Sequence, residues 1–494
     1  MLFNSLPFLI FFPIVILLYY IMPAKLRRFW LLAASYFFYM SWNPAYVLLI
    51  LFSTVATYTA GRLMERREDK AYRKRVLAAV IIMNLALLFF FKYFDFALSN
   101  LNHVLGIFHL KKLESPFSLL LPVGISFYTF QSLGYAIDVY RGTVSAEKDF
   151  IDYALFVSFF PQLVAGPIER SKNLLSQVKE VSKRRLWNYD GMVSGFGMML
   201  WGFFMKMCIA DRVALLVDTV FNNIHAIGTF EALAGAAGFS VQIYADFAGY
   251  SAIAIGAARM MGFTLMENFN CPYFAESIAE FWRRWHISLS GWFRDYLYIP
   301  LGGNRKGKFR KYVNIMIVFL VSGLWHGSAW AFVLWGGLHG LYQIIGELTL
   351  PLRDKLHELL KTDRESFSFH LGKKVLTAVL AGLAWIFFRT RSLRLGLLFI
   401  RRMICHYDPW VLFDDSMYSW GLDFREVGIL VFGVLLLFFV SLVREKKGCD
   451  IGNWLLTQGL VFRWLVFLGL ITAVVVWGEY GIDFDSAQFI YFDF

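Results

Sequence analysis

A histidine interrupts one of the longest uncharged stretches of the chain. His326 lies in SGLWHGSAW (322–330), and no Lys, Arg, Asp or Glu occurs from Tyr312 to Gly346. At about 1.5 Å per residue, a helix that begins after Lys311 would carry this ring roughly 22 Å into a hydrocarbon core about 30 Å thick. A titratable group at that depth costs free energy unless it is paired, hydrated or functional.

The neighbours of His326 suit a proton acceptor. Gly323 and Gly327 would let backbone or substrate approach closely, and Trp325 and Trp330 would supply bulky, dry surface. Burial disfavours a charged imidazole, so the ring would stay neutral and able to take the proton of an attacking hydroxyl. The alternative is a core histidine that is hydrogen-bonded to a backbone carbonyl.

A second histidine lies in EFWRRWHISLSGWFRDYLYIPLGGNR (280–305). Helical spacing predicts an apolar stripe of Phe281, Trp285, Leu289, Trp292 and Tyr296. The polar residues fall mostly outside that stripe: Arg283, Arg284, Ser290, Arg294 and Asp295. Such a helix is too polar to span a bilayer, so we expect an interfacial helix over 280–300 on the cytoplasmic side. His286, on its margin, would either take part in chemistry or only hydrogen-bond a neighbour within a membrane anchor.

A third polar group occurs inside an otherwise apolar segment, QIYADFAGYS (242–251). Gln242, Asp246 and Tyr250 are spaced by four residues and therefore share one helix face. A carboxylate inside a membrane usually faces a cavity or a partner. These side chains would either line a tunnel or form a hydrogen-bonded knot between helices.

Other chemistries find little support in the sequence. There is no GxSxG elbow, P-loop or GxGxxG fingerprint, and the four cysteines have no metal-binding spacing. We therefore expect no metal site. The net charge of +12 would suggest nucleic acid in a soluble protein, but basic cytoplasmic loops explain it more simply here.

The elements that must position these residues are membrane helices. The chain is 58% hydrophobic and only 17% charged, whereas soluble domains have about 25% charged residues. Long uncharged runs account for the difference and correspond to about eleven membrane segments. We predict an all-α, polytopic transmembrane protein with N-terminal helices (1–115), a catalytic core (116–350) and C-terminal helices (351–494). The first helix has no cleavage site after it and should be retained.

Charge sets the expected orientation. The positive-inside rule places the basic segments in the cytoplasm, among them 62–75, 283–311, 389–402 and 444–447. The acidic and aromatic segment 407–424 would lie outside. Segments 76–98, 117–138 and 150–168 would give three crossings between two basic loops, so one of them must be broken or re-entrant. The Gly/Pro-containing stretches 122–142 and 161–170 are the candidates, around a central tunnel.

These motifs also carry a family resemblance. WRRWHISLSGWFRDYLYIPLGG (282–303) and SGLWHGSAWAFVLWGGLHG (322–340) closely resemble the two central signatures of the membrane-bound O-acyltransferases, and in particular the bacterial alginate O-acetyltransferase branch. PQLVAGPIER (161–170), QIYADFAGYS and the terminal FIYFDF are similar to that branch as well. The resemblance extends from about residue 120 to the end of the chain.

The resemblance implies a mechanism and partners. Family members move an acyl group from a cytoplasmic thioester to a hydroxyl through a membrane tunnel, and their motif histidines map to His326 and His286. The implied donor is acetyl-coenzyme A, with no bound cofactor. The implied partners are membrane lipid, a polysaccharide acceptor and a periplasmic or surface acetyltransferase of the SGNH type, in a bacterial inner membrane. No nucleic acid is implied.

The donor and tunnel residues expected on this basis come from the same motifs. Segment 283–311 holds eight basic residues against one acid, Asp295, and would face the donor phosphates. The expected donor or tunnel residues are Trp325, Trp285, Arg283, Arg284, Ser290, Arg294, Asp246, Gln242 and Tyr250.

Two alternatives remain open at this point. The teichoic acid D-alanyltransferase branch of the family would take its acyl group from a carrier protein instead of a coenzyme A thioester. A protein of another class, a polysaccharide export or transport subunit without catalysis, would share the polytopic layout. Internal repeats are common in transporters, and this sequence shows none.

Overall fold

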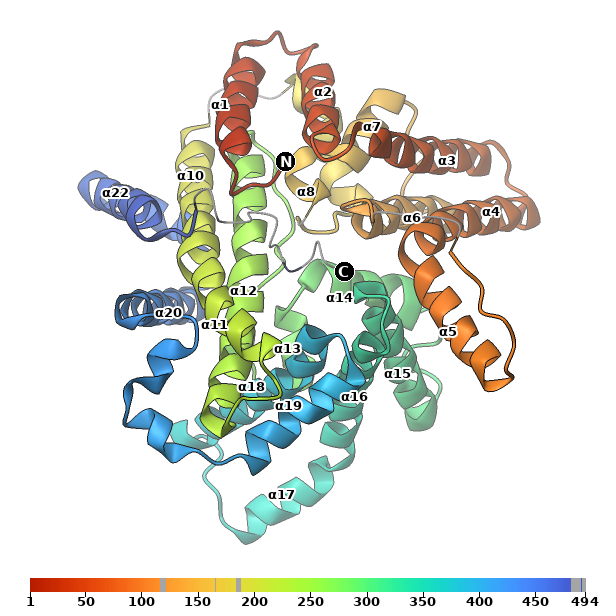
Figure 1. Ribbon diagram of the computed structural model, residues 1–494. Coiled ribbons are helices and arrows are strands. Elements are labelled where there is room, and N and C mark those ends of the chain that lie inside the picture. Colours follow the sequence, from red (N-terminus) through yellow and green to blue (C-terminus); the bar gives the residue numbers. More distant parts are fainter. Residues whose placement is uncertain (116–120, 165, 184–187, 481–489, 491–494) are drawn as a thin grey trace. The chain divides into compact units, whose positions relative to one another are not determined.

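The computed structural model describes residues 1–115, 121–164, 166–183, 188–480 and 490 (Figure 1). Within these residues the chain is helical and has no β-strand, which confirms the all-α prediction. Of the terminal FIYFDF, only Ile490 lies among the described residues. The chain forms two compact units, which we call the N unit (Met1–Met199 and Ile253–Met266) and the C unit (Leu200–Ala252 and Glu267–Phe494). The division at 115 and 350 stays a prediction.

The N unit contains the first ten α-helices. They are α1 (Leu6–Ile21), α2 (Arg27–Met40), α3 (Val47–Arg66), α4 (Lys70–Leu88), α5 (Phe94–Ile107), α6 (Ile125–Arg141), α7 (Phe150–Ser158), α8 (Phe160–Leu163), α9 (Ser176–Lys179) and most of α10 (Tyr189–Phe203). Helix α6 is buried along nearly its whole length and packs against α3 and α4.

The C unit contains the remaining helices. They are α11 (Asp211–Asn222), α12 (Thr229–Met260, which ends in the N unit), α13 (Ile278–Arg284), α14 (Ile287–Phe293), α15 (Gly307–His326), α16 (Trp330–Leu348), α17 (Leu350–Leu359), α18 (Phe367–Thr390), α19 (Leu393–Cys405), α20 (Phe424–Lys447), α21 (Ile451–Leu456) and α22 (Leu460–Trp477).

Several helices have the dimensions of membrane spans. In the described part of the chain, five are long and apolar enough to cross a bilayer: Pro44–Arg66, Lys70–Ile107, Phe367–Thr390, Phe424–Lys447 and Leu460–Trp477. Helix α1 is apolar but shorter. These helices agree with a polytopic membrane protein, while the expected number of about eleven segments stays a prediction.

The chain is broken near 161–170, one of the two stretches predicted to interrupt a crossing, while the number of crossings stays a prediction. Instead of one helix over 150–168, α7 ends at Ser158 and the four-residue α8 follows. The backbone amide of Phe160 donates to the Ser35 hydroxyl of α2 at 3.1 Å. The side-chain amide of Gln162 donates to the backbone carbonyl of Phe156 at 2.7 Å. Side chains of the protein thus satisfy backbone groups that the break releases, which is the condition for irregular backbone at membrane depth.

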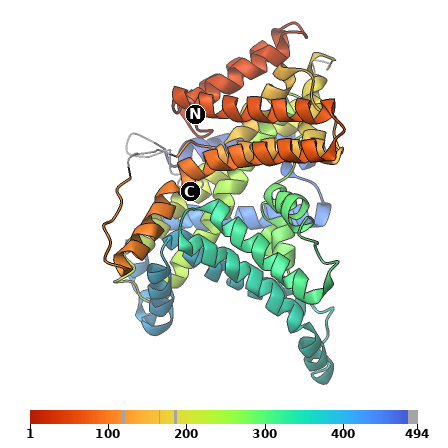
Figure 2. The same cartoon turned by 90° about the vertical axis from the view of Figure 1, so that its right-hand side faces the viewer.

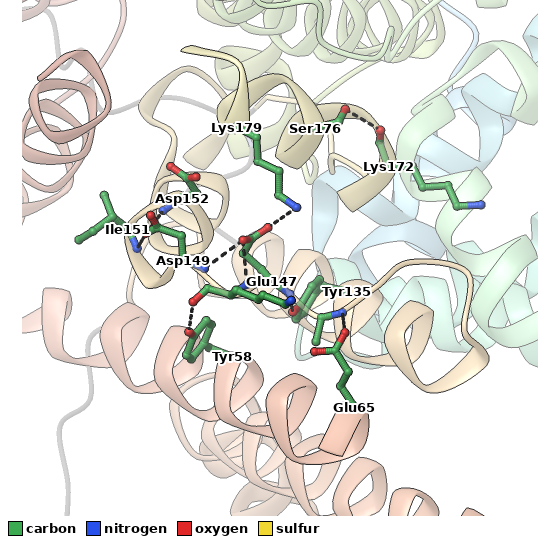
Figure 3. A network of polar contacts seen from close by, with 12 residues as sticks. Tyr58, Glu65, Tyr135, Glu147, Asp149, Ile151, Asp152, Lys172, Ser176 and Lys179 are labelled. Carbon is green, nitrogen blue, oxygen red and sulfur yellow. Dashed lines mark hydrogen bonds and ion pairs between the residues drawn. The ribbon is translucent and has the colours of Figure 1, made fainter. Parts of the chain in front are cut away.

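The loop between α6 and α7 is pinned by a polar network (Figure 3). The Glu147 carboxylate accepts from the backbone amides of Lys148 and Asp149 and pairs with Lys179. The Tyr135 hydroxyl accepts from the Glu147 amide at 2.8 Å, and the Tyr58 hydroxyl donates to the Lys148 carbonyl at 2.7 Å. This loop therefore fixes where the broken segment begins.

Ion pairs show which helix ends of the C unit lie together. Lys311, near the start of α15, pairs with Glu347 at the end of α16, and the two helices lie side by side (Figures 1 and 2). Glu276 pairs with Lys373 near the start of α18 at 2.6 Å. At the end of α20, Arg444 pairs with Glu267 and Glu445 pairs with Arg284. The basic end is our name for the part of the C unit that holds these ion pairs, at the start of α15 and α18 and the end of α16 and α20. The positive-inside rule predicts that the basic end faces the cytoplasm.

This arrangement favours another side for segment 389–402 than charge counting predicts. Helix α18 begins at the basic end and is long enough to cross, so its last residues and α19 lie at the opposite end. Helix α19 has 13 residues and spans about 20 Å. Its Phe399 stacks on Phe221 of α11, and its other face exposes Arg394 and Arg401, so it cannot return across a bilayer. We therefore predict that segments 389–402 and 407–424 lie on the same side of the membrane.

Two native cysteines can test this topology. Cys405 is exposed at the end of α19, and Cys449 follows α20 at the basic end. We expect a membrane-impermeant maleimide added to spheroplasts to label Cys405, and to label Cys449 only after the membrane is permeabilised. A cysteine placed at Lys306 should behave like Cys449. Labelling at position 306 in intact spheroplasts would reverse the orientation, and labelling of Cys405 only after permeabilisation would restore the original placement of 389–402.

Candidate active site

The segment around His286 is not the single helix over 280–300 that periodicity predicts. Helix α13 ends at Arg284, Trp285 is extended, and His286 adopts a left-handed conformation with φ 43° and ψ 54° before α14 begins. A left-handed residue other than glycine costs roughly 1–2 kcal/mol. The break turns His286 into the C unit, where its side chain is 0% exposed, and not toward a membrane surface.

A buried asparagine holds this break in place. The Asn268 side chain accepts from the Ser288 hydroxyl at 2.6 Å and donates to the Ser251 hydroxyl at 3.1 Å. Its backbone carbonyl accepts from the Ile287 amide at 2.9 Å. Sequence reasoning missed Asn268. The only signal was an amide side chain next to Phe269 in a short loop, which is weak evidence without its partners.

His286 lies among aromatic rings. The Phe247 ring of α12 meets it edge-on at 4.7 Å between centroids, and Trp325 lies 6.1 Å away. Position 286 lies outside the five candidate spans. Burial lowers the pKa of His286 to about 3, so its ring is neutral at physiological pH. A neutral imidazole carries one N–H donor and one acceptor nitrogen.

His326 ends α15 at the tip of the α15–α16 hairpin and is 2% exposed. Glycines allow the two helices to approach, because a Cβ at Gly323 would overlap the Phe332 carbonyl oxygen. The rings of Trp325 and Trp335 each lie 4.9 Å from the His326 ring. The dry surround expected from Trp325 is therefore present, whereas Trp330 is 56% exposed and contributes nothing to it.

The two histidines are neighbours. Their ring centroids are 6.4 Å apart, with the ring planes tilted by 58°. The expectation that they lie at membrane depths differing by roughly 22 Å is wrong, because the helix break at Trp285–His286 brings the second ring to the end of α15. Both rings can therefore contact one small group.

A cavity of about 720 Å³ lies among the helices that flank the histidines, although neither histidine lines it. Its lining residues come from α13, α14, α15, α16, α17 and α18. Of the expected donor residues, it is lined by Arg283, Ser290 and Arg294. Cavities that hold small molecules in proteins are commonly about 300–1,000 Å³.

Three other expected donor residues lie elsewhere. Arg284 points away from this cavity and pairs with Glu280 at 2.8 Å and with Glu445 at 2.6 Å. Trp285 stacks on Phe281 within the aromatic core, and Trp325 packs on His326. None of the three lines this cavity.

The inner wall of the cavity is one helical turn from each histidine. Ser322 precedes His326 by four residues on α15, and Leu289 follows His286 by three on α14. Trp282 lines the same wall, and its ring lies 5.7 Å from that of Trp335, which touches His326. The cavity thus comes within one helical turn of both histidines, and the rings of Trp282 and Trp335 lie between its wall and His326.

The wall of the cavity carries positive charge. Its basic residues are Arg283, Arg294, Lys311 and Arg353, and its acidic residues are Glu276 and Glu347. Glu347 pairs with Lys311, and Glu276 pairs with His370 and Lys373. Since the acids already have partners, the exposed Arg283 guanidinium is available to an anionic ligand.

The polar face of 242–251 belongs to a buried ion cluster. Lys206 pairs with Asp211 at 2.6 Å and with Asp246 at 2.8 Å, and its ammonium lies 5.6 Å from the Tyr250 ring. The Ile490 amide donates to Asp246 at 2.9 Å. Lys206 was missed by sequence reasoning. Neither Asp246 nor Gln242 lines the 720 Å³ cavity, so a tunnel role for Gln242, Asp246 and Tyr250 stays a prediction.

The arrangement can be compared with known proteins. Residues 144–364, which include both histidines, match the membrane-bound O-acyltransferase family. The chain is 38% identical over 447 residues to the probable alginate O-acetylase AlgI of Pseudomonas aeruginosa, which covers 90% of this chain and 82% of the relative. The chain belongs to the membrane-bound O-acyltransferase family. It is therefore an O-acyltransferase.

Two further relatives lie within this family. The peptidoglycan O-acetyltransferase of Helicobacter pylori is 36% identical over 437 residues, 82% of this chain and 80% of the relative. The teichoic acid D-alanyltransferase of Bacillus subtilis is 28% identical over 287 residues, 55% of this chain and 69% of the relative. The O-acetyltransferases thus resemble this O-acyltransferase over more of its length.

The asparagine that holds the His286 break gives a prediction. Asn268→Ala should remove the hydrogen bonds from the Asn268 side chain to Ser288 and Ser251, at a cost of about 1–3 kcal/mol, and should let the His286 ring move. We expect the kcat of acyl transfer to fall by about tenfold or more, because a small misplacement of a catalytic group is costly. The KM for the donor should change little, since the cavity arginines are untouched.

The measurement is steady-state kinetics on the purified protein. Asn453→Ala is the matched control, because the side chain of Asn453 also bonds within the C unit, to Asp450 on the flank of α21. If Asn268→Ala lowers activity only in proportion to the loss of folded protein, Asn268 has no role beyond stability.

Proposed function

We propose that this O-acyltransferase takes an acetyl group from acetyl-coenzyme A at the cytoplasmic face of a bacterial inner membrane and passes it outward for O-acetylation of an exported or cell-surface polysaccharide. The observation that carries the proposal is a pair of adjacent buried histidines, one helical turn beyond the inner wall of a cavity lined by basic residues. The names of the relatives from Pseudomonas aeruginosa and Helicobacter pylori support acetyl transfer and a polysaccharide acceptor, with alginate as one candidate.

The chemistry follows from the two rings. An acceptor hydroxyl attacks the thioester carbonyl, and His326 takes the hydroxyl proton as the new C–O bond forms. The N–H of neutral His286 donates to the carbonyl oxygen as it gains negative charge. The C–S bond then breaks, the acetyl ester remains on the acceptor, and the proton held by His326 passes to the departing thiolate. The thioester is already activated, so these steps need only a base, a donor and a dry site.

The partner on the outer side of the membrane is inferred from the family resemblance, and not from a contact in the structure. We propose that a periplasmic or surface acetyltransferase of the SGNH type receives the acetyl group and delivers it to the polysaccharide. Placement of His326 at the tip of the α15–α16 hairpin, at the end of α15 away from the basic end, supports an acceptor that approaches from outside.

The donor can be tested directly against the alternative. The purified protein in nanodiscs is given acetyl-coenzyme A or a D-alanyl carrier protein, and release of the free thiol is measured with a polymer acceptor present. We expect coenzyme A release that depends on His326, and none from the carrier protein. Turnover of the D-alanyl carrier without turnover of acetyl-coenzyme A would replace acetylation with D-alanyl transfer.

Adjacent arginines give a matched prediction for donor binding. Arg283 is exposed and lines the cavity, whereas Arg284 is held by Glu280 and Glu445. Arg283→Gln should raise the KM for acetyl-coenzyme A by about tenfold, since a charge-assisted bond to phosphate contributes roughly 1.5–3 kcal/mol. Arg284→Gln removes the same charge one residue away and should leave that KM unchanged while lowering thermal stability. Equal KM changes in the two variants would show that long-range charge, and not the cavity, governs donor binding.

A further inference from the structure

The charge of helix α19 differs from what the positive-inside rule predicts for its end of the C unit. Segment 391–405 (RSLRLGLLFIRRMIC) has four arginines and no acidic residue, yet it lies at the end of the C unit opposite the basic end. Basic residues are uncommon on that side of membrane proteins. Their presence calls for a counter-charge.

Some of the basic residues here are used inside the protein. Arg389, at the end of α18, pairs with Asp218 of α11, and Arg402 donates to the His225 carbonyl. Arg394 and Arg401 are different, because both are exposed. Seven residues apart on one helix, they project in nearly the same direction and about 10 Å from each other.

The rest of the outer face of α19 is apolar. Leu397 and Ile404, also seven residues apart, are 61% and 70% exposed and form a second row beside the two arginines. The opposite face is packed, with Phe399 on Phe221 and with Gly396 close to Phe387. Exposed aromatic and aliphatic side chains follow at once in the chain: Tyr407, Trp410, Leu412 and Phe413.

The depth of this surface is fixed by its flanking helices. Helix α18, which ends at Thr390, and α20, which begins at Phe424, are both long and apolar enough to cross a bilayer. Since α19 connects the ends of two such helices, we infer that it lies near the level of the lipid headgroups. A row of arginines beside a row of aliphatic side chains, with tryptophan and tyrosine nearby, is the pattern of a helix that lies in a membrane interface.

We propose that Arg394 and Arg401 of α19 bind the phosphates of anionic phospholipids in the outer leaflet, with Leu397 and Ile404 inserted among the acyl chains. The guanidinium fork matches phosphate geometry, and its charge supplies selectivity for anionic over zwitterionic headgroups. The site anchors the α18–α19 corner, whose Phe388 ring lies 5.6 Å from that of His326. The lipid would thereby hold the outer side of the reaction site in place.

The test uses the full chain in nanodiscs of phosphatidylcholine with phosphatidylglycerol. A fluorophore is attached to native Cys405 in a Cys449→Ser background, and its quenching by nitroxide-labelled phosphatidylglycerol is compared with that by nitroxide-labelled phosphatidylcholine. We expect quenching by the anionic lipid to be severalfold stronger. Since a basic residue near an anionic surface contributes about 1 kcal/mol, Arg401→Gln should reduce this preference by up to about fivefold.

Arg402→Gln provides the matched control. It removes the same charge from the neighbouring residue, whose side chain donates to the His225 carbonyl instead of facing outward. It should keep the lipid preference. Equal quenching by both lipids in the unchanged protein would overturn the proposal, and so would an equal loss in the two variants. A fluorescence change caused by a soluble polyuronate, abolished by Arg401→Gln and without lipid preference, would assign the surface to an acidic polysaccharide instead.

Discussion

Replacing His326 with alanine should abolish acyl transfer while the protein remains folded in the membrane. The ring ends α15 against the aromatic wall of the donor cavity, where it is the candidate base for the acceptor proton. General-base catalysis is worth about 10²–10⁴-fold, so the remaining rate should fall below detection in cells. His326→Gln should fail equally, because an amide cannot take up the proton. Ester content of the polymer by NMR and coenzyme A release by the purified protein measure the loss.

The control must separate chemistry from folding and from export. His225→Gln changes another histidine of the C unit whose side chain is exposed, and it should keep normal ester content. Polymer from His326→Ala with a normal ester content would rule out His326 as the base. Full acetylation with lost export would instead favour a transport subunit without catalysis, the reading that family membership now opposes.

The site could be predicted from the sequence only in part. His326 was identified because a histidine flanked by glycines and tryptophans in an uncharged stretch needs an explanation, and burial gave a physical one. The meeting of His326 with His286 could not be foreseen. Helical periodicity over 280–300 is the same whether the helix is continuous or broken, and the break depends on Asn268, which lies eighteen positions before His286 and contacts Ser288. Long-range hydrogen bonds leave no periodic trace in a sequence.

The topology, too, could be predicted only in part from the sequence. Charge counting placed 389–402 with the other basic segments, since it weighs every arginine alike. The structure shows that Arg389 pairs with Asp218 and that Arg402 donates to the His225 carbonyl, so both are used inside the C unit. The broken crossing at 161–170 was predictable, because Gly and Pro at membrane depth restrict backbone conformation locally.

Arg283 and Arg284 also have different surroundings that the sequence alone does not reveal. Adjacent residues on a helix point about 100° apart, so two identical side chains meet different surroundings. Arg283 reaches the cavity, and Arg284 reaches Glu445 near the end of α20. Composition identified the basic segment, and only packing separated the binding residue from the structural one.

His286→Ala should be impaired but not inactive, in contrast to His326→Ala. With the rings 6.4 Å apart, both histidines can reach one carbonyl, and His286 stays neutral because burial lowers its pKa to about 3. Its N–H can then stabilise the developing oxyanion but is dispensable for proton removal. Loss of one such donor typically costs about 10²–10³-fold in kcat. Binding of acetyl-coenzyme A should stay close to normal, since His286 does not line the donor cavity.

The decisive comparison is His286→Asn against His286→Ala. Asparagine tolerates the left-handed backbone of this position and keeps an N–H donor, whereas alanine loses both, so the asparagine variant should retain more activity. Single-turnover transfer from labelled acetyl-coenzyme A measures each variant apart from donor binding. The double variant His286→Ala/His326→Ala should be no slower than His326→Ala, because groups that act on one transition state are not additive. If His286→Ala and His326→Ala prove equally inactive while both bind the donor normally, the two rings act as one unit, and the assignment of base to one and oxyanion donor to the other is wrong.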